Sequence, residues 1–445
     1  DFFGDGLAEE IASQLGQVHD LKVIAHTSAL QFKGRPDPPR AIGEALGVTT
    51  LLEGSVLVAG ARLRVTARLV SAPTGEQIWA DEYERDRRDV FAIQRDIAER
   101  IVGSLRATLS PEERTRLARQ PTADAEAHNL YLLGRYYFGK GTFSGRRRSV
   151  EYFEQAIKRD SLFAPAYAAL ADALVFLAYL GQARPREVLP QARADARRAI
   201  QIDSTFGDAY ASLGVITAAY DWDWKAAEAL FRRALTLSPN SVYAHMWYSF
   251  FVLSPLGRHD DALAEMRRAL DLDPVSLEVR YHLGVANYMA RRYDSAIAEY
   301  RRALDLDQTY APARDGLGFS YAAIGRFDDA VSEMRRAVAD STVTSDAVLG
   351  YVYALAGRHT EARAILRALT DRARHQYVIP MDFSLLYTGL GEPDAAFPWL
   401  SRAYDERLPL LVGWVNAPPN DRLRNDPRFT ALVRDLGLDA RGSMR

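Results

Sequence analysis

The sequence has 445 residues and no cysteine, and this absence excludes several kinds of chemistry. Disulfide bridges, zinc sites built on thiolates and cysteine nucleophiles all need the missing thiol group. The chain must therefore be stabilised by the packing of its apolar residues, which make up 48% of it.

An excess of charge and long apolar runs are also missing. The 56 Lys and Arg residues are balanced by 58 Asp and Glu residues, which gives a formal net charge of −2. A general nucleic-acid binder would show a basic excess, so we expect no nucleic-acid partner. No run of eighteen or more apolar residues occurs, and we expect no membrane span in this chain.

Sequence signatures of catalysis and of metal binding are absent as well. There is no nucleophile elbow, glycine-rich nucleotide loop, kinase signature or HExxH motif. Two pairs of aspartates, Asp221 with Asp223 and Asp271 with Asp273, fall at turns or helix ends without the further ligands of a calcium loop. We therefore predict that the chain is not an enzyme and has no catalytic residues, metal site or cofactor.

The sequence does contain a repeated pattern of small residues. Ala234, Ala269, Ala303 and Ala337 follow one another at separations of 35, 34 and 34 residues. A second series recurs at nearly the same step, and its members are Gly214, Ser249, Gly284 and Gly318. Small side chains at two fixed positions indicate pairs of helices that touch there, because larger side chains would push the helices apart.

The clearest unit of this pattern spans Arg280–Asp307. Ala296, Tyr300 and Ala303 have the spacing of one helical face, which would pack against Gly284 of a preceding helix. Neither helix can bury all its apolar surface alone, so the unit needs copies of itself on both sides. Glycines in the equivalent turns, such as Gly257, Gly325 and Gly357, are expected to end the first helix in the left-handed conformation.

A period near 34 with small residues in these places resembles the tetratricopeptide repeat. The resemblance covers residues 125–407, where we expect about eight hairpins. The first two hairpins contain apparent insertions around Lys140–Arg147 and Gly181–Leu189. The resemblance implies an α-solenoid, a superhelix of helix hairpins in which the first helix of each repeat lines an inner groove. We expect residues 408–445 to cap the apolar flank of the last repeat.

The first 109 residues mix helical and alternating periods and predict a small α/β domain. The expected elements are a helix capped by Asp5 over Gly6–Gly16, a strand Leu21–Ala25, a helix Pro38–Leu46, strands Val48–Val58, Arg62–Val70 and Gln77–Tyr83, and a helix from Asp89. In the second of the three meandering strands the apolar residues alternate, so one face of the sheet should be covered by helices. Residues 110–124 are expected to be a linker.

Several phrases in this region resemble the TolB-like (FlgO-like) α/β domain, among them FFGDGLAEEIASQL, LKVIAHTSALQFKG and GEQIWADEYERD. In bacteria this domain often precedes tetratricopeptide repeats in multidomain regulators. Members of the family have a strand just before the Asp-Gly helix start, and this chain begins at Asp1 without it. The resemblance therefore implies a fragment of a larger regulator, with an open sheet edge at which another chain could pair. The absence of cysteine is compatible with both the bacterial cytoplasm and the periplasm.

Aromatic residues on the first helices of the repeats are the candidate contact residues. Registering each helix on the small residue gives nine inward positions: Tyr131, Phe138, Phe176, Tyr243, Phe250, Tyr281, Tyr288, Phe319 and Tyr351. The residues after the small positions are apolar, not the Lys, Asn and Arg of a carboxylate clamp, so an apolar peptide or helix is the expected occupant. The alternative is that most of these aromatics are packing residues, with Tyr243, Tyr281 and Tyr288 the most exposed.

Two functions follow from the sequence. The first is a non-catalytic scaffold that binds a peptide or partner protein in an aromatic groove. The second, which the family resemblance implies, is the sensory or regulatory half of a larger signalling protein with a Ser/Thr kinase, nucleotide cyclase or winged-helix effector domain outside this chain.

Overall fold

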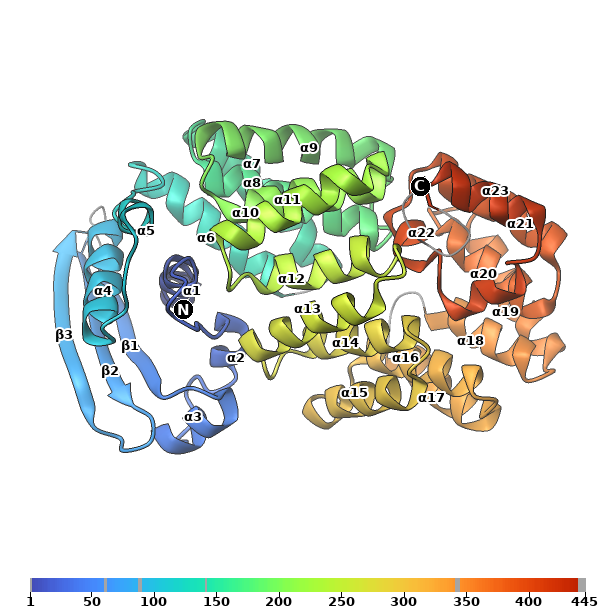
Figure 1. The fold of residues 1–445 in the computed structure, drawn as a ribbon, viewed down its shortest axis with the longest axis horizontal. Coiled ribbons are helices and arrows are strands. Elements are labelled where there is room, and N and C mark those ends of the chain that lie inside the picture. Colours follow the sequence, from blue (N-terminus) through green and yellow to red (C-terminus); the bar gives the residue numbers. More distant parts are fainter. Residues whose placement is uncertain (1, 60–61, 87–89, 141, 341–344, 439–445) are drawn as a thin grey trace.

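The computed structural model describes residues 2–59, 62–86, 90–140, 142–340 and 345–438. An N-terminal part with a small sheet is followed by a long arch of helix hairpins, as the sequence predicted (Figure 1). None of the described helices is both long and apolar enough to cross a membrane.

The N-terminal part contains one antiparallel sheet in the order β1-β2-β3. Its elements are α1 (Phe2–Leu15), α2 (His26–Leu30), α3 (Pro39–Leu46), β1 (Thr50–Ala59), β2 (Arg62–Ser71), β3 (Gln77–Asp86), α4 (Val90–Ser104) and α5 (Pro111–Leu117). The alternating residues Leu63, Val65 and Leu69 of β2 are buried as expected. Helix α1 begins before the predicted cap Asp5, and the predicted start at Asp89 lies outside the described residues.

The predicted strand Leu21–Ala25 is wrong, because these residues form no strand. Two of their backbone groups form hydrogen bonds with the hairpin array instead. The Asn240 side chain donates to the Leu21 carbonyl at 3.0 Å, and the Ala25 N–H donates to the Leu272 carbonyl at 2.8 Å. This apolar run therefore contacts the hairpin array and does not form a strand, because a strand needs a neighbouring strand to pair its backbone N–H and C=O groups.

Eight hairpins follow within the described residues. Their helices are α6 (Ala125–Gly139) with α7 (Phe143–Arg159), α8 (Ala164–Tyr179) with α9 (Pro185–Ile202), α10 (Gly207–Ile216) with α11 (Trp224–Leu237), α12 (Val242–Tyr248) with α13 (His259–Leu272), α14 (Leu277–Met289) with α15 (Tyr293–Leu306), α16 (Ala311–Ala323) with α17 (Phe327–Asp340), α18 (Ser345–Leu355) with α19 (His359–Arg372), and α20 (Pro380–Leu390) with α21 (Pro393–Asp405). The predicted insertions are mostly helical, because the extra residues lengthen α7 and α9.

Small residues bring the two helices of each hairpin together. A Cβ atom added to Gly284 would lie 2.4 Å from the Tyr300 ring, and one added to Gly318 would lie 2.4 Å from Met334. The alanines of the other series, Ala234, Ala269, Ala303 and Ala337, are all fully buried. The glycines of the turns, including Gly257, Gly325 and Gly357, have positive φ as predicted.

The N-terminal part is attached to the array through polar anchors. In the turn before α14, the Asp273 carboxylate accepts hydrogen bonds from Thr27 at 2.6 Å and Ser28 at 2.5 Å, and Asp273 is only 4% exposed. Between α11 and α12, Asn240 donates to the Gly16 carbonyl at 2.9 Å. These contacts place α1 and α2 beside the array (Figure 1).

The C-terminal segment packs on more than the last hairpin. It comprises α22 (Pro409–Trp414), the 3₁₀ turn η4 (Pro418–Arg422) and α23 (Pro427–Asp435). Helix α23 contacts α21, whereas α22 contacts α8 and the π-helical segments η2 (Thr217–Asp221) and η3 (Ser249–Leu253) that continue α10 and α12. The Trp224 indole N–H donates to the Leu436 carbonyl at 2.8 Å. The segment therefore links the end of the array to its middle.

Substituting Gly284 tests the close approach of the paired helices. We expect Gly284→Ala to lower the free energy of unfolding by about 1–3 kcal/mol, because the methyl group overlaps the buried Tyr300 ring. The matched control is Gly103→Ala in α4, where a Cβ atom meets nothing within 4 Å. The control should be neutral or stabilising by up to about 1 kcal/mol. Equal denaturant midpoints for the two variants would contradict the packing role.

Candidate functional site

A cavity of about 730 Å³ lies on the concave side of the array. Apart from α7, the array helices that line it are all first helices of hairpins: α8, α14, α16, α18 and α20. Three of the predicted contact residues, Phe176, Tyr281 and Phe319, line this cavity. A volume of this size is typical of pockets that enclose a small ligand or a few side chains of a peptide.

Most of the other predicted aromatics surround the cavity without lining it. The ring of Phe138 packs edge-on against Phe176 at 5.2 Å, and Tyr243 packs against the same ring at 6.4 Å. On the other side, Tyr288 and Tyr351 pack against Phe319 at 6.0 and 5.9 Å. These four residues fix the positions of the rings that do face the cavity.

Tyr131 and Phe250 lie elsewhere. Tyr131 lines a second pocket beside α1, and Phe250 packs against Gly413 of α22. A Cβ atom added to Gly413 would lie 2.3 Å from the Phe250 ring. Phe250 therefore supports the returning C-terminal segment instead of an open groove.

The exposure expected for three tyrosines is partly wrong. Tyr288 is only 1% exposed, because Tyr293, Phe319 and Trp414 surround its ring. Tyr243 and Tyr281 are half-buried. Of the three, only Tyr281 combines partial exposure with a place in the cavity wall.

The C-terminal segment forms one wall of the cavity. Leu410, Trp414 and Asn420 line it, and the Asn420 amide is held by hydrogen bonds to the Trp414 and Val415 carbonyls at 2.9 and 3.2 Å. Arg291 on the turn after α14 forms an ion pair with Asp421 at 2.8 Å. The segment thus converts part of the concave surface into an enclosed site.

Helix α22 packs against the π-helical segments η2 and η3. Each replaces the last turn of an inner helix and widens it by one residue per hydrogen-bonded turn. In η3 the Ser249 hydroxyl donates to the Ala262 carbonyl at 2.9 Å, which anchors the segment to α13. Interrupted helices of this kind are frequent at functional sites.

The charged residues of the cavity wall were not predicted from the sequence to be part of a site. Glu278, Asp315 and Asp382 come from the N-terminal halves of α14, α16 and α20, and Arg146 comes from α7. The available signal was an acid near the start of successive inner helices. Such acids are common because they complement the helix dipole, so the signal alone did not distinguish a site from helix stabilisation.

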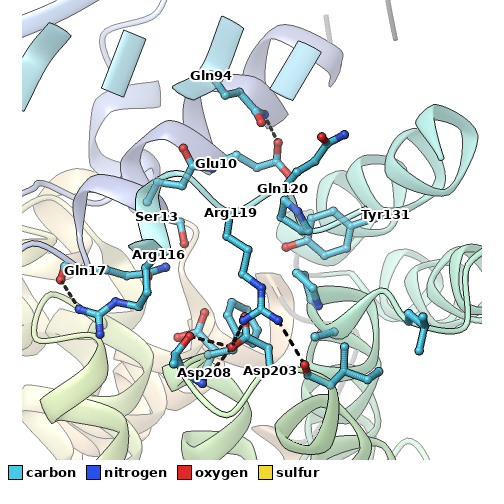
Figure 2. Close-up of a pocket in the computed structure, with 18 of the residues that line it drawn as sticks. Glu10, Ser13, Gln17, Gln94, Arg116, Arg119, Gln120, Tyr131, Asp203 and Asp208 are labelled. Atoms are coloured by element: carbon cyan, nitrogen blue, oxygen red, sulfur yellow. Dashed lines mark hydrogen bonds and ion pairs between the residues drawn. The ribbon is translucent and has the colours of Figure 1, made fainter. Parts of the chain in front are cut away.

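The second pocket, of about 540 Å³, lies at the junction of α1 with the first hairpins (Figure 2). Arg119 pairs with Asp203 at 2.6 Å across it, and Glu10 of α1 pairs with the buried His128 of α6 at 2.8 Å. Basic and acidic side chains are mixed here and pair with one another. The pocket is therefore part of the polar junction between the N-terminal part and the array.

No group of three or more His, Cys, Asp or Glu side chains is arranged to hold a metal ion within the ranges that the structure covers. Asp221, Asp223 and Asp273 have structural partners. Asp221 pairs with Arg193, the Asp223 carboxylate caps α11 by accepting from the Ala226 N–H at 3.0 Å, and Asp273 anchors α2.

Comparison with known proteins identifies the repeats. The tetratricopeptide repeat profile matches residues 256–311 and 317–376, so the chain contains tetratricopeptide repeats. A protein of Rhizobium meliloti (strain 1021) named as an adenylate cyclase is 31% identical over 206 residues, which are 46% of this chain and 35% of that protein. The chain thus matches about a third of that relative's length.

Among solved structures, YrrB, described as a tetratricopeptide protein with an unusual peptide-binding site, is 21% identical with a TM-score of 0.31. The alignment covers 49% of this chain and 99% of YrrB. The human IFIT1 dimer with m7Gppp-AAAA is 16% identical with a TM-score of 0.48, covering 71% of this chain and 77% of that one.

Asp172 of α8 lies near Tyr243 and should make the free energy of unfolding depend on pH. Burial raises its pKa to about 7, although Ser212 donates a hydrogen bond to it. Between pH 4 and pH 7 the folded state therefore keeps a proton that the unfolded state, with a pKa of about 3.9, has lost, so stability falls as pH rises.

We expect Asp172→Asn to remove this contribution. The variant should therefore be more stable relative to the wild type at pH 8 than at pH 5, so its free energy of unfolding minus that of the wild type should increase between these pH values. Asp371→Asn, at a carboxylate that is 68% exposed, serves as the control and should show no such change. Urea titrations at both pH values measure the difference, and parallel pH profiles for Asp172→Asn and the wild type would contradict it.

Proposed function

We propose that the chain is a non-catalytic scaffold that binds a segment of a partner protein at the concave cavity. The observation that supports this most directly is the convergence of Phe176, Tyr281 and Phe319 from three inner helices on one partly open cavity. Tetratricopeptide repeats commonly present such a concave surface to partners. Tyrosine and phenylalanine supply large contact areas at little entropic cost, which makes them effective anchors.

The partly enclosed shape of the cavity limits the conformations that a bound segment can have. The C-terminal segment covers the concave face over α8, η2 and η3, so a long helix cannot lie along the whole array. A short extended peptide or a single protruding loop fits a cavity of about 730 Å³ better. The remaining predicted aromatics then act as the supporting layer behind the contact residues.

Tyr281→Ala tests this assignment. A peptide selected on the intact protein from a random displayed library should bind the variant with a loss of about 2 kcal/mol in binding free energy, because an anchor ring is removed. Leu306→Ala, at a leucine of α15 that is 49% exposed and does not line the cavity, should bind as the wild type does. Titration calorimetry gives both affinities, and undiminished binding to Tyr281→Ala would refute the cavity assignment.

A second candidate function is the regulatory part of a larger signalling protein. The specific observation in its favour is the similarity to a longer protein named as an adenylate cyclase. The open edge of β1 agrees with this, because β1 pairs only with β2 among the described strands. Leu52 and Val58 lie opposite Leu69 and Leu63, on the core face of the sheet, and are 39% and 42% exposed. A further strand or chain at this edge would bury them.

Determining the reading frame upstream of the codon for Asp1 tests this candidate. We expect it to encode a strand that can pair with β1 and, before that, an effector domain such as a nucleotide cyclase, a Ser/Thr kinase or a winged-helix domain. An initiator methionine followed only by the strand would exclude the larger protein. The result would leave the scaffold function unaffected.

A further inference from the structure

The concave cavity is acidic as well as aromatic. Its wall includes the carboxylates of Glu278, Asp315 and Asp382, whereas Arg146 is the one Lys or Arg among the described residues that line it. Lining charges of three negative and one positive leave the cavity with a formal excess of two negative charges. The acids come from three separate inner helices, so the excess is spread around the wall.

The aromatic rings of the same wall suit a cation. Tyr179, Tyr281, Tyr310 and Trp414 line the cavity beside the carboxylates. Aromatic faces attract ammonium and guanidinium groups, and the attraction grows where water is excluded. Arg146 already shows this contact, because its guanidinium lies 5.7 Å from the centre of the Phe176 ring.

Two buried acceptor atoms of wall residues have no hydrogen-bond partner among the described residues. The Nδ1–H of His282 donates to the Glu278 carbonyl at 2.9 Å, which makes Nε2 an acceptor. His282 is only 5% exposed, and its Nε2 has no hydrogen-bond partner among the described residues. The Oε1 atom of Gln182, on another part of the wall, is buried without a partner in the same way.

An entering cation would stabilise the ionised form of two of these carboxyl groups, which the protein around them disfavours. Burial raises the pKa of Asp382 to about 7, and Asp346 and Asp315 add to the rise against the opposing effect of Arg372. Desolvation by the surrounding protein raises the pKa of Glu278 too, against the opposing effect of Arg146, and this residue remains open to the cavity. Neither acid is fully compensated by the protein's own cations.

We propose that this cavity binds a basic side chain, the guanidinium of arginine or the ammonium of lysine, presented by the partner's bound segment. The proposal rests on the proposed scaffold function and specifies its ligand. Glu278 and Asp382 accept hydrogen bonds from the cation, and Tyr281 and Trp414 pack on it. Its charge preference is the opposite of a carboxylate clamp.

The test uses the peptides selected on the intact protein from the random library. We expect them to share an arginine or lysine, and replacing an arginine by citrulline, which is neutral and of similar shape, should weaken binding about tenfold or more. Glu278→Gln and Asp382→Asn should weaken the arginine peptide by a similar factor and leave the citrulline peptide unchanged. Asp371→Asn, at an exposed carboxylate outside the cavity wall, should change neither affinity.

The outcomes separate this inference from the function on which it rests. Peptides that need Tyr281 but bind equally well with citrulline would overturn the basic-ligand assignment and leave the scaffold intact. Failure to select any peptide that depends on Tyr281 would overturn both. Free arginine amide that binds as tightly as the peptide would show a small-molecule cation site, which also contradicts a partner's side chain. Circular dichroism of the variants checks that they remain folded.

Discussion

The close approach of two helices at a small residue is the constraint on which the rest of the structure depends. At Gly284 and Gly318 the first helix has no side chain, and the Tyr300 ring and the Met334 side chain of the second helix occupy that space directly against its backbone. Each hairpin is therefore thin and rigid, and its uncovered faces are satisfied only by the next hairpin. Repeating this contact places the first helices of the hairpins side by side on a concave surface.

The two ends of the chain modify that surface in different ways. At the start, α1 and α2 are fastened to the turns before α12 and α14 by Asn240 and Asp273, so the small sheet cannot be treated as an independent appendage. At the other end, α22 packs on the π-helical segments and narrows the concave face to a cavity. Asp382, which lines this cavity, is partly buried there, and the loss of water raises its pKa and strengthens its interactions with charge.

The repeats and most of the N-terminal elements could be predicted because their signals are local and periodic. The strand at Leu21–Ala25 could not, since its apolar residues and backbone groups bind the distant turns around Asn240 and Leu272. The contact surface was predicted only in part. Registering on Gly284 predicts which residues face inward, and only three of the nine line the cavity. The register also does not show that Trp414 packs against Tyr288 or that Gly413 packs against Phe250.

The sequence by itself determined the helical hairpins and their period, because these follow from the spacing of small and apolar residues along one segment. Only the tertiary structure decided which inward residues stay accessible and which charges meet. Glu278, Asp315 and Asp382 are far apart in the chain, and the segment that encloses them begins after the last repeat. Their common environment arises from the curvature of the whole array and from the packing of α22 on it. Neither can be predicted from a local sequence pattern, because both depend on contacts between distant segments.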